Sequence, residues 1–147
     1  MKIAEALVGV PSLFLDTAPV TYYVESVSPL RDIMDVVVAN VREGKIEFVT
    51  SPITLAECLV HPLRKGDNDL AERFRRAITR GTNTRFVGVD RVAGEAATLR
   101  AELNIPLLDA FQVACARAAG CDAFLTNDRT LTRVPGLRII VLDTMES

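Results

Sequence analysis

The sequence predicts an α/β fold in which a mainly parallel sheet forms the middle layer of a three-layer α/β/α sandwich. Five short apolar runs, rich in β-branched and aromatic residues, alternate with longer segments whose apolar residues recur at helical spacing. Alternating strands and helices favour a parallel sheet that is covered on both faces. A chain of 147 residues suits a single unit with a substantial core, so we expect one domain over residues 1–147.

The predicted strands are residues 12–16, 46–50, 84–89, 123–126 and 137–142. Helical spacing predicts helices at residues 30–43, 53–61, 67–80, 91–103 and 107–119, and Thr17-Ala18-Pro19 leads into a further helix. Gly44, Gly81 and Gly120 act as stop signals after three of these helices. Pro52 suits the first turn of its helix, and we expect Pro62 to end that helix. The pattern does not predict the order of the strands.

The composition is that of a globular protein from a reducing compartment. With 49% hydrophobic and 24% charged residues, it resembles an ordinary soluble domain. The opening residues lack the basic start and apolar run of a secretory signal, and no uncharged stretch is long enough to span a bilayer. The odd number of cysteines, Cys58, Cys115 and Cys121, follows no zinc spacing. We therefore expect reduced core thiols, a cytoplasmic location and no membrane partner.

Charge is unevenly distributed along the chain. The segment from Arg64 to Arg85 contains seven basic and three acidic residues, a net charge of +4, which leaves −6 for the rest of a chain of net charge −2. A basic strip beside an acidic pocket could hold a phosphate backbone. The alternative is a solvated helix face with no binding role.

Four acidic residues are the main candidates for a functional site: Asp16, Glu57, Asp109 and Asp128. Asp16 and Asp128 each close a strand-like run, and the C-terminal ends of parallel strands border the ligand crevice of open α/β sheets. Converging carboxylates repel one another unless a cation holds them. Oxygen ligands without nearby histidine or cysteine favour Mg²⁺ or Mn²⁺ over Zn²⁺, so the sequence predicts a site for one or two such ions.

Each acid also has a simpler explanation. Asp16 could cap the following helix, Asp109 could complement the helix dipole in a first turn, and Asp128 could cap a short helix at residues 129–131. Glu57 could be an exposed helix residue, although its apolar neighbours predict a position near the buried side. A single crevice would account for all four residues together.

Other residues invite a functional interpretation less strongly. His61 is the only histidine, so a mechanism based on two histidines is excluded, and we expect His61 to cap helix carbonyls before Pro62. Tyr22 and Tyr23 could stack on bases or pack the first helix. Arg100 could pair with a carboxylate of the site or lie on the surface.

Three motifs resemble those of the PIN domain family. They are Leu13-Phe14-Leu15-Asp16-Thr17, Ser51-Pro52-Ile53-Thr54-Leu55-Ala56-Glu57, and Leu108-Asp109-Ala110-Phe111-Gln112-Val113-Ala114-Cys115-Ala116, followed by Gly120 and Thr126-Asn127-Asp128. The resemblance covers nearly the whole chain, and the compact toxins of the VapBC type are the most similar members. It implies a parallel sheet of four or five strands, a homodimer, an antitoxin partner and RNA cleavage that depends on Mg²⁺ or Mn²⁺.

The resemblance also assigns residues. It implies that Asp16, Glu57, Asp109 and Asp128 are the catalytic and metal-binding acids, supported by the polar residues Thr17, Thr126 and Asn127. The chain departs from the family after Asp16, where Ala18-Pro19 replaces a small polar residue.

Several other functions compete with that of a toxin ribonuclease. A housekeeping nuclease of the same fold, acting in RNA maturation or on DNA, and an inactive binding module both remain open. A phosphatase that needs a second aspartate two positions after Asp16 is excluded by Ala18. A phosphoacceptor receiver domain is excluded because no lysine follows Lys65.

Overall fold

The computed structural model of the protein describes residues 1–27 and 29–147. Five parallel strands form one sheet in the order β3-β2-β1-β4-β5. They are β1 (Ser12–Leu15), β2 (Glu47–Thr50), β3 (Thr84–Phe86), β4 (Ala123–Thr126) and β5 (Arg138–Val141). Every predicted strand is present. β3 ends earlier than predicted because Thr50, the last residue of its neighbour β2, already pairs with Phe86.

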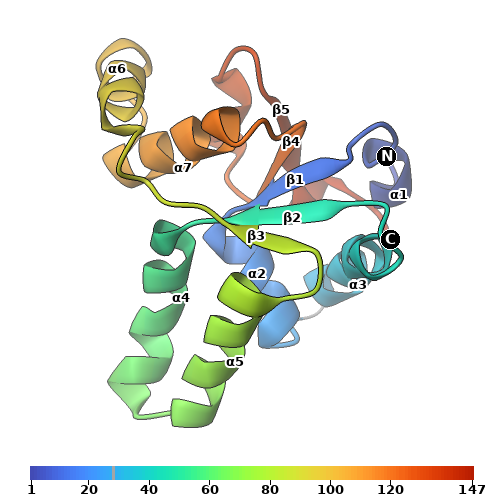
Figure 1. Ribbon diagram of the computed structural model, residues 1–147. Coiled ribbons are helices and arrows are strands. Elements are labelled where there is room, and N and C mark those ends of the chain that lie inside the picture. Colours follow the sequence, from blue (N-terminus) through green and yellow to red (C-terminus); the bar gives the residue numbers. More distant parts are fainter. Residues whose placement is uncertain (28) are drawn as a thin grey trace.

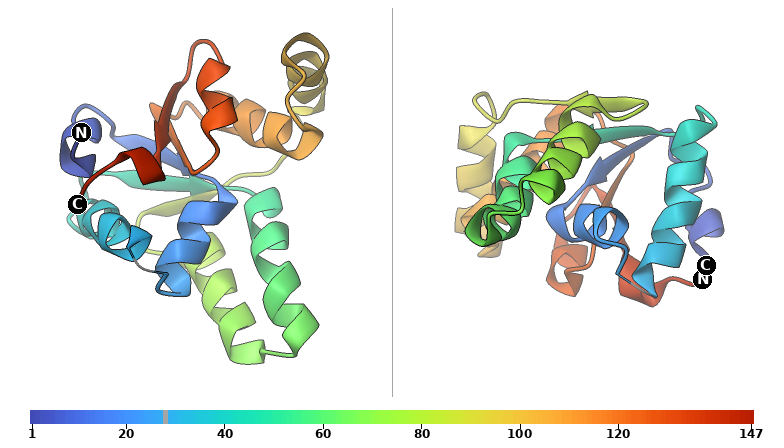
Figure 2. Two further views of the ribbon diagram at one scale, coloured as in Figure 1. Left: turned by 180° about the vertical axis from the view of Figure 1, so that it is seen from behind. Right: turned by 90° about the horizontal axis from the view of Figure 1, so that it is seen from below.

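Helices cover both faces of this sheet, as predicted (Figures 1 and 2). One face carries α2 (Thr17–Val24), α3 (Leu30–Arg42), α4 (Pro52–Lys65) and α5 (Asn68–Arg80). The other face carries α6 (Ala93–Leu103) and α7 (Leu107–Ala118). Short 3₁₀ helices follow β4 and β5: η1 (Arg129–Arg133) and η2 (Leu142–Thr144). A four-residue helix before β1, α1 (Ile3–Ala6), was not predicted, and it lies beside the C-terminus (Figure 1).

The prediction that Pro62 ends α4 was wrong. The helix continues through Pro62 to Lys65 and ends at Gly66, whose φ of 68° is left-handed. Proline removes one backbone hydrogen bond from a helix, but the ring of Pro62 is buried and α4 packs along α5, which offsets this loss. His61 therefore lies within α4, before its last turn, and is exposed to solvent. The expectation that it caps the end of the helix was wrong.

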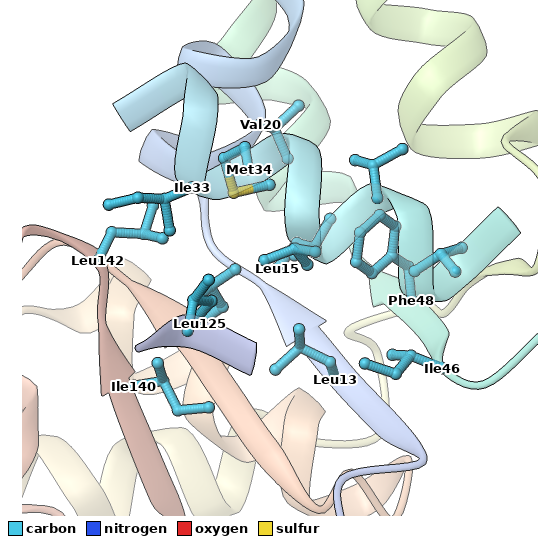
Figure 3. Packing of buried hydrophobic residues seen from close by; sticks show 14 of the residues in the cluster. Leu13, Leu15, Val20, Ile33, Met34, Ile46, Phe48, Leu125, Ile140 and Leu142 are labelled. Carbon is cyan, nitrogen blue, oxygen red and sulfur yellow. The ribbon is translucent and has the colours of Figure 1, made fainter. Parts of the chain in front are cut away.

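Two hydrophobic clusters, one on each face, hold the layers together. Strand residues alternate between them, so Leu13 and Leu15 enter one cluster and Phe14 enters the other. Figure 3 shows the first cluster, in which side chains of α2 and α3 pack on the strands. In the second, Phe14 and Phe124 stack with ring centroids 5.1 Å apart beneath α6 and α7. This stack joins the central strand β1 to its neighbour β4.

The cysteines agree with the sequence prediction. Cys58 and Cys115 are buried, Cys121 is partly buried, and all three are free thiols. Burial raises the pKa of Cys58 to about 12, which keeps its thiol protonated. Within residues 1–27 and 29–147, no helix has the length and apolar character needed to cross a membrane.

The aromatic stack between the central strands should carry much of the stability. We expect Phe124→Ala to lower the free energy of unfolding by about 3–5 kcal/mol, because it removes a fully buried ring and leaves a cavity. Phe86→Ala is the matched control on the edge strand, where the side chain is 38% exposed, and it should cost under about 1 kcal/mol. Urea denaturation measures both, and equal losses would contradict this account of the core.

Candidate active site

The strand order brings the C-terminal ends of β1 and β4 together. From β1 the chain moves outward to β2 and β3, then returns to β4 on the other side of β1. Neighbouring strands whose connections leave in opposite directions create a crevice at their carboxyl ends. Asp16 directly follows β1, and Asn127-Asp128 directly follow β4. The two strand-end acids predicted from the sequence therefore face the same crevice.

Asp16 is the most buried acid of this group, with only 9% of its surface exposed. It is the N-cap of α2, and its Oδ1 accepts a hydrogen bond of 2.9 Å from the backbone N–H of Thr17. Its Oδ2 accepts a hydrogen bond of 2.8 Å from the hydroxyl of Thr126. Burial raises the pKa of Asp16, the charge of Glu57 adds to this, and hydrogen bonds from Thr126, Thr17 and Gln112 act in the opposite direction. Capping and a place in the crevice are thus compatible.

Glu57 lies at the same edge and is exposed. This agrees with the simpler explanation, an exposed helix residue, and contradicts the position near the buried side that its apolar neighbours predicted. The buried face of α4 consists of Thr54, Cys58 and Pro62, and Glu57 lies outside it. Its Oε1 accepts a hydrogen bond of 2.7 Å from the hydroxyl of Thr17. Thr17 therefore holds Asp16 through its backbone and Glu57 through its side chain.

The pKa of Asp109 is affected by the charges of the other three acids. It lies in the first turn of α7, where burial raises its pKa to about 6 and the charges of Asp16, Asp128 and Glu57 add to the shift. Among the described residues, no group donates a hydrogen bond to its carboxylate. A half-buried carboxylate without a donor and with three acidic neighbours is the feature that a bound cation would stabilise.

Asp128 caps the short helix η1, as its simpler explanation predicted. Its Oδ1 accepts hydrogen bonds from the backbone N–H of Thr130 at 2.9 Å and from the Thr130 hydroxyl at 2.6 Å. Its own N–H donates to the hydroxyl of Thr126 at 3.0 Å. Asp128 thus caps η1 while its charge still acts on Asp109.

The chemistry of these donors fits a hard divalent cation. The four side chains offer only carboxylate oxygens, which Mg²⁺ and Mn²⁺ prefer. In the part of the chain that the structure describes, no three of the His, Cys, Asp and Glu side chains are close enough to share one ion. Hydrogen bonds to Thr17 and Thr130 hold Glu57 and Asp128 in their present positions, and mutual repulsion favours this separation.

The predicted supporting residues behave differently from one another. Thr17 and Thr126 contact the acids directly, as described above. Asn127 lines the same pocket as Asp16 and Asp128 but makes its hydrogen bonds elsewhere: its Nδ2 donates to the hydroxyl of Tyr22 at 3.1 Å, and its Oδ1 accepts from the backbone N–H of Asp143 at 2.9 Å. It joins α2 to the C-terminal segment. Tyr22 and Tyr23 both pack against the larger hydrophobic cluster, which favours the packing interpretation.

Sequence reasoning missed a buried polar network beneath the acids. Gln112 is 1% exposed, donates from Nε2 to Thr54 Oγ1 at 2.7 Å, and accepts a short hydrogen bond from Ser51 Oγ. Thr54 in turn donates to the carbonyl of Leu15 at 3.1 Å. The network joins α7, α4 and β1, the elements that carry or precede Asp109, Glu57 and Asp16. The available signal was the position of Gln112 three residues after Asp109, on the same face of a helix.

Four of the seven basic residues from Arg64 to Arg85 form ion pairs within the described part of the protein. Arg75, Arg76 and Arg80 surround Glu72, with nitrogen–oxygen distances of 3.9, 3.3 and 3.0 Å. Arg85 binds Glu47 at 3.1 Å. This geometry favours a solvated helix face. Arg100 contacts backbone carbonyls, so it is a surface residue and not the partner of a site carboxylate.

Fold and site together define an α/β protein with an acidic crevice between β1 and β4, where the order of the strands reverses. The PIN domain family model matches residues 13–137, which is most of the chain, and the chain belongs to this family. A search of curated proteins gave no match.

Solved structures of toxin–antitoxin proteins share the fold. FitAB bound to an IR36 DNA fragment aligns with a TM-score of 0.73 and 19% identity, covering 92% of this chain and 98% of that one. VapBC2 from Rickettsia felis, bound to a DNA fragment from its promoter, gives 0.70 and 18%, covering 88% and 98%. VapC20 from Mycobacterium tuberculosis, a toxin that cleaves the sarcin–ricin loop, gives 0.63 and 17%, covering 76% and 86%. At these identities the likeness establishes the fold.

The raised pKa of Asp109 predicts a pH-dependent loss of stability. Because the folded protein binds this proton more tightly than the unfolded chain, the stabilisation is present below pH 3.8 and is lost as pH rises through about 6. In the absence of divalent cations, Asp109→Asn should therefore be more stable than the wild type at pH 7.5. The gain should be on the order of 1 kcal/mol, since solvent screens a half-exposed group.

Denaturation at pH 4 and pH 7.5 measures this difference, and the gain should largely disappear at pH 4. Glu5→Gln removes an exposed carboxylate from α1, which precedes β1 and so lies toward the end of the strands opposite the crevice. It should give no comparable gain. If the wild type and Asp109→Asn have the same free energy of unfolding at pH 7.5, the charge of Asp109 does not destabilise the folded protein.

Proposed function

We propose that this PIN domain protein is an endoribonuclease that depends on Mg²⁺ or Mn²⁺ and cleaves RNA phosphodiester bonds. The observation that carries the proposal is that Asp16 and Asp128 line one pocket at the ends of β1 and β4, in a chain whose residues 13–137 match the PIN domain. The pKa of the half-buried Asp109, which burial and the charges of the three other acids raise to about 6, supports it. Carboxylates that destabilise one another in one crevice are expected where a site is built to hold a cation. Family membership supports nuclease chemistry for these residues.

The four carboxylates would bind the ion or ions in different ways. Asp16 and Asp109 are the first candidates for direct ligands, because they are the more buried pair with raised pKa values. Glu57 and Asp128 would bind directly or through water. When bound, the cation supplies neutralisation of phosphate charge and makes a water molecule a better nucleophile. Thr17 and Thr126 orient Asp16 through hydrogen bonds, so this ligand is held in position before any ion arrives.

The biological role that fits best is the toxin of a type II toxin–antitoxin pair. The chain shares its fold with FitAB and VapBC complexes, which favours a protein antitoxin as the partner that blocks the site. The family resemblance favours a homodimer that acts in the cytoplasm. A housekeeping nuclease would use the same acids, and the identity of the cleaved RNA separates the two roles.

The central test is cleavage of labelled tRNA and rRNA fragments with Mg²⁺, Mn²⁺ or EDTA. We expect metal-dependent cuts by the wild type and a loss of at least about 100-fold in rate for Asp16→Asn, because one ligand loses its charge while its shape is kept. Asp35→Asn is the matched control, since Asp35 lies on α3 in an exposed ion pair with Arg31. It should cleave like the wild type.

Two outcomes would contradict the proposal. Unimpaired cleavage by Asp16→Asn would remove the acids from the chemistry. No cleavage with either metal, by folded protein free of antitoxin, would favour an inactive binding module.

Metal binding should also be visible without any substrate. A ligand that binds only the folded state stabilises it by about 2.7 kcal/mol at a free concentration about 100 times its Kd. Thermal unfolding of the wild type should therefore shift upward by several degrees with Mn²⁺, and EDTA should reverse the shift. Asp16→Asn should lose most of it. An equal shift in both proteins would place the bound ion elsewhere.

A further inference from the structure

Two arginine side chains from different elements converge on the loop that leads into α7. Arg100, on α6, donates from Nη1 to the carbonyls of Asn104 and Ile105 at 3.5 and 3.3 Å. Arg133, at the end of η1, donates from Nη2 to the same Asn104 carbonyl at 3.5 Å. The two guanidinium groups therefore meet at one carbonyl oxygen, with these two nitrogens at most about 7 Å apart, although their residues are far apart in the chain.

Neither group is neutralised within the part of the chain that the structure describes. Seven of the 14 arginines form ion pairs with carboxylates there, among them Arg129 with Asp143 at 3.3 Å. Of the seven that form none, Arg100 and Arg133 are the two that contact the same carbonyl. Two adjacent cations repel each other, so an anion between them would be favourable. Their carbonyl contacts are long and exposed, and a guanidinium can exchange such contacts for stronger ones.

The pair contacts segments that lead to two of the acids. Arg133 also donates from Nε to the carbonyl of Thr130, the residue whose hydroxyl and N–H bind Asp128. The loop that both arginines contact runs straight into the first turn of α7, which contains Asp109. The two cations are thus attached to the segments that carry Asp109 and Asp128.

We propose that Arg100 and Arg133 bind a backbone phosphate of the RNA strand beside the carboxylates. Four acids repel a polyanion, so strand binding requires positive charge near them. A guanidinium offers a planar fork of donors that matches phosphate oxygens, and two forks can hold one phosphate. This proposal rests on the proposed function, because it names a substrate contact for the same site. The arginines act in binding and take no part in the chemical step.

Binding and cleavage are measured separately to test this assignment. Fluorescence anisotropy with a labelled single-stranded RNA, in an Asp16→Asn background that cannot cleave, gives Kd at a series of salt concentrations. Arg100→Gln combined with Arg133→Gln should weaken binding by about 10-fold or more. The slope of log Kd against log salt should fall by about 0.7, since the two arginines share one phosphate and each phosphate contact on a single strand contributes about 0.7.

Two further variants separate binding from structure. Arg138→Gln is the matched control: Arg138 is exposed and unpaired among the described residues, and it begins β5 at the opposite end of the sheet. It should change neither Kd nor slope. Arg100→Lys combined with Arg133→Lys keeps the charges and should keep the salt slope, while Kd rises because the bidentate fork is lost. These outcomes would support the proposal.

Other outcomes would overturn it. A double glutamine variant with unchanged Kd and slope but a lower Tm would show that the arginines only cap carbonyls. RNA binding that is absent in the Asp16→Asn parent would also overturn it. Metal-dependent cleavage by the wild type is scored independently, so the proposed ribonuclease can stand when the arginine assignment fails. If the wild type cleaves no RNA, the proposed function itself fails.

Discussion

The rest of the structure depends on holding a buried carboxylate at the end of the central strand. Asp16 is 9% exposed, and moving a charged group out of water is unfavourable unless hydrogen bonds replace its hydration. Those bonds come from Thr17 at the start of α2 and from Thr126 at the end of β4. The same Thr126 hydroxyl accepts the N–H of Asp128, so one side chain sets the spacing of two acids. The start of α2, the end of β4 and the start of η1 are thereby held together at one point.

A second set of hydrogen bonds sets the distance between the two helices that carry the remaining acids. Gln112 lies under the crevice and binds Ser51 and Thr54, so α7 and α4 cannot move independently. Ser51 is also the N-cap of α4, where it accepts hydrogen bonds from the backbone of Ile53 and Thr54. A fully satisfied buried network of this kind is rigid, because each donor would lose its partner if the helices shifted. Rigid support suits a site whose ligands repel one another.

The hydrophobic layers offset the destabilising effect of the site. The raised pKa values of Asp16 and Asp109 mean that folding brings negative charges into an environment that disfavours them. The two clusters on either face of the sheet, together with the Phe14–Phe124 stack between the central strands, supply the opposing stabilisation. Electrostatic strain is concentrated at one edge of the sheet, while the strands beneath it are fully packed. Such a division is common where function requires charges that the fold alone would reject.

The sequence by itself determined the elements and the acids. Apolar runs predicted all five strands, helical spacing predicted the main helices, and the position of Asp16 after a strand predicted a crevice residue, because these signals lie in consecutive residues. Only the tertiary structure decided what packing controls: that α4 continues past Pro62, that Glu57 is exposed, and that Asn127 binds the Tyr22 hydroxyl instead of a site carboxylate. It alone revealed that Gln112 meets Ser51 and that Arg100 meets Arg133 at one carbonyl. The physical reason is that contacts between distant residues depend on strand order, which local periodicity does not encode.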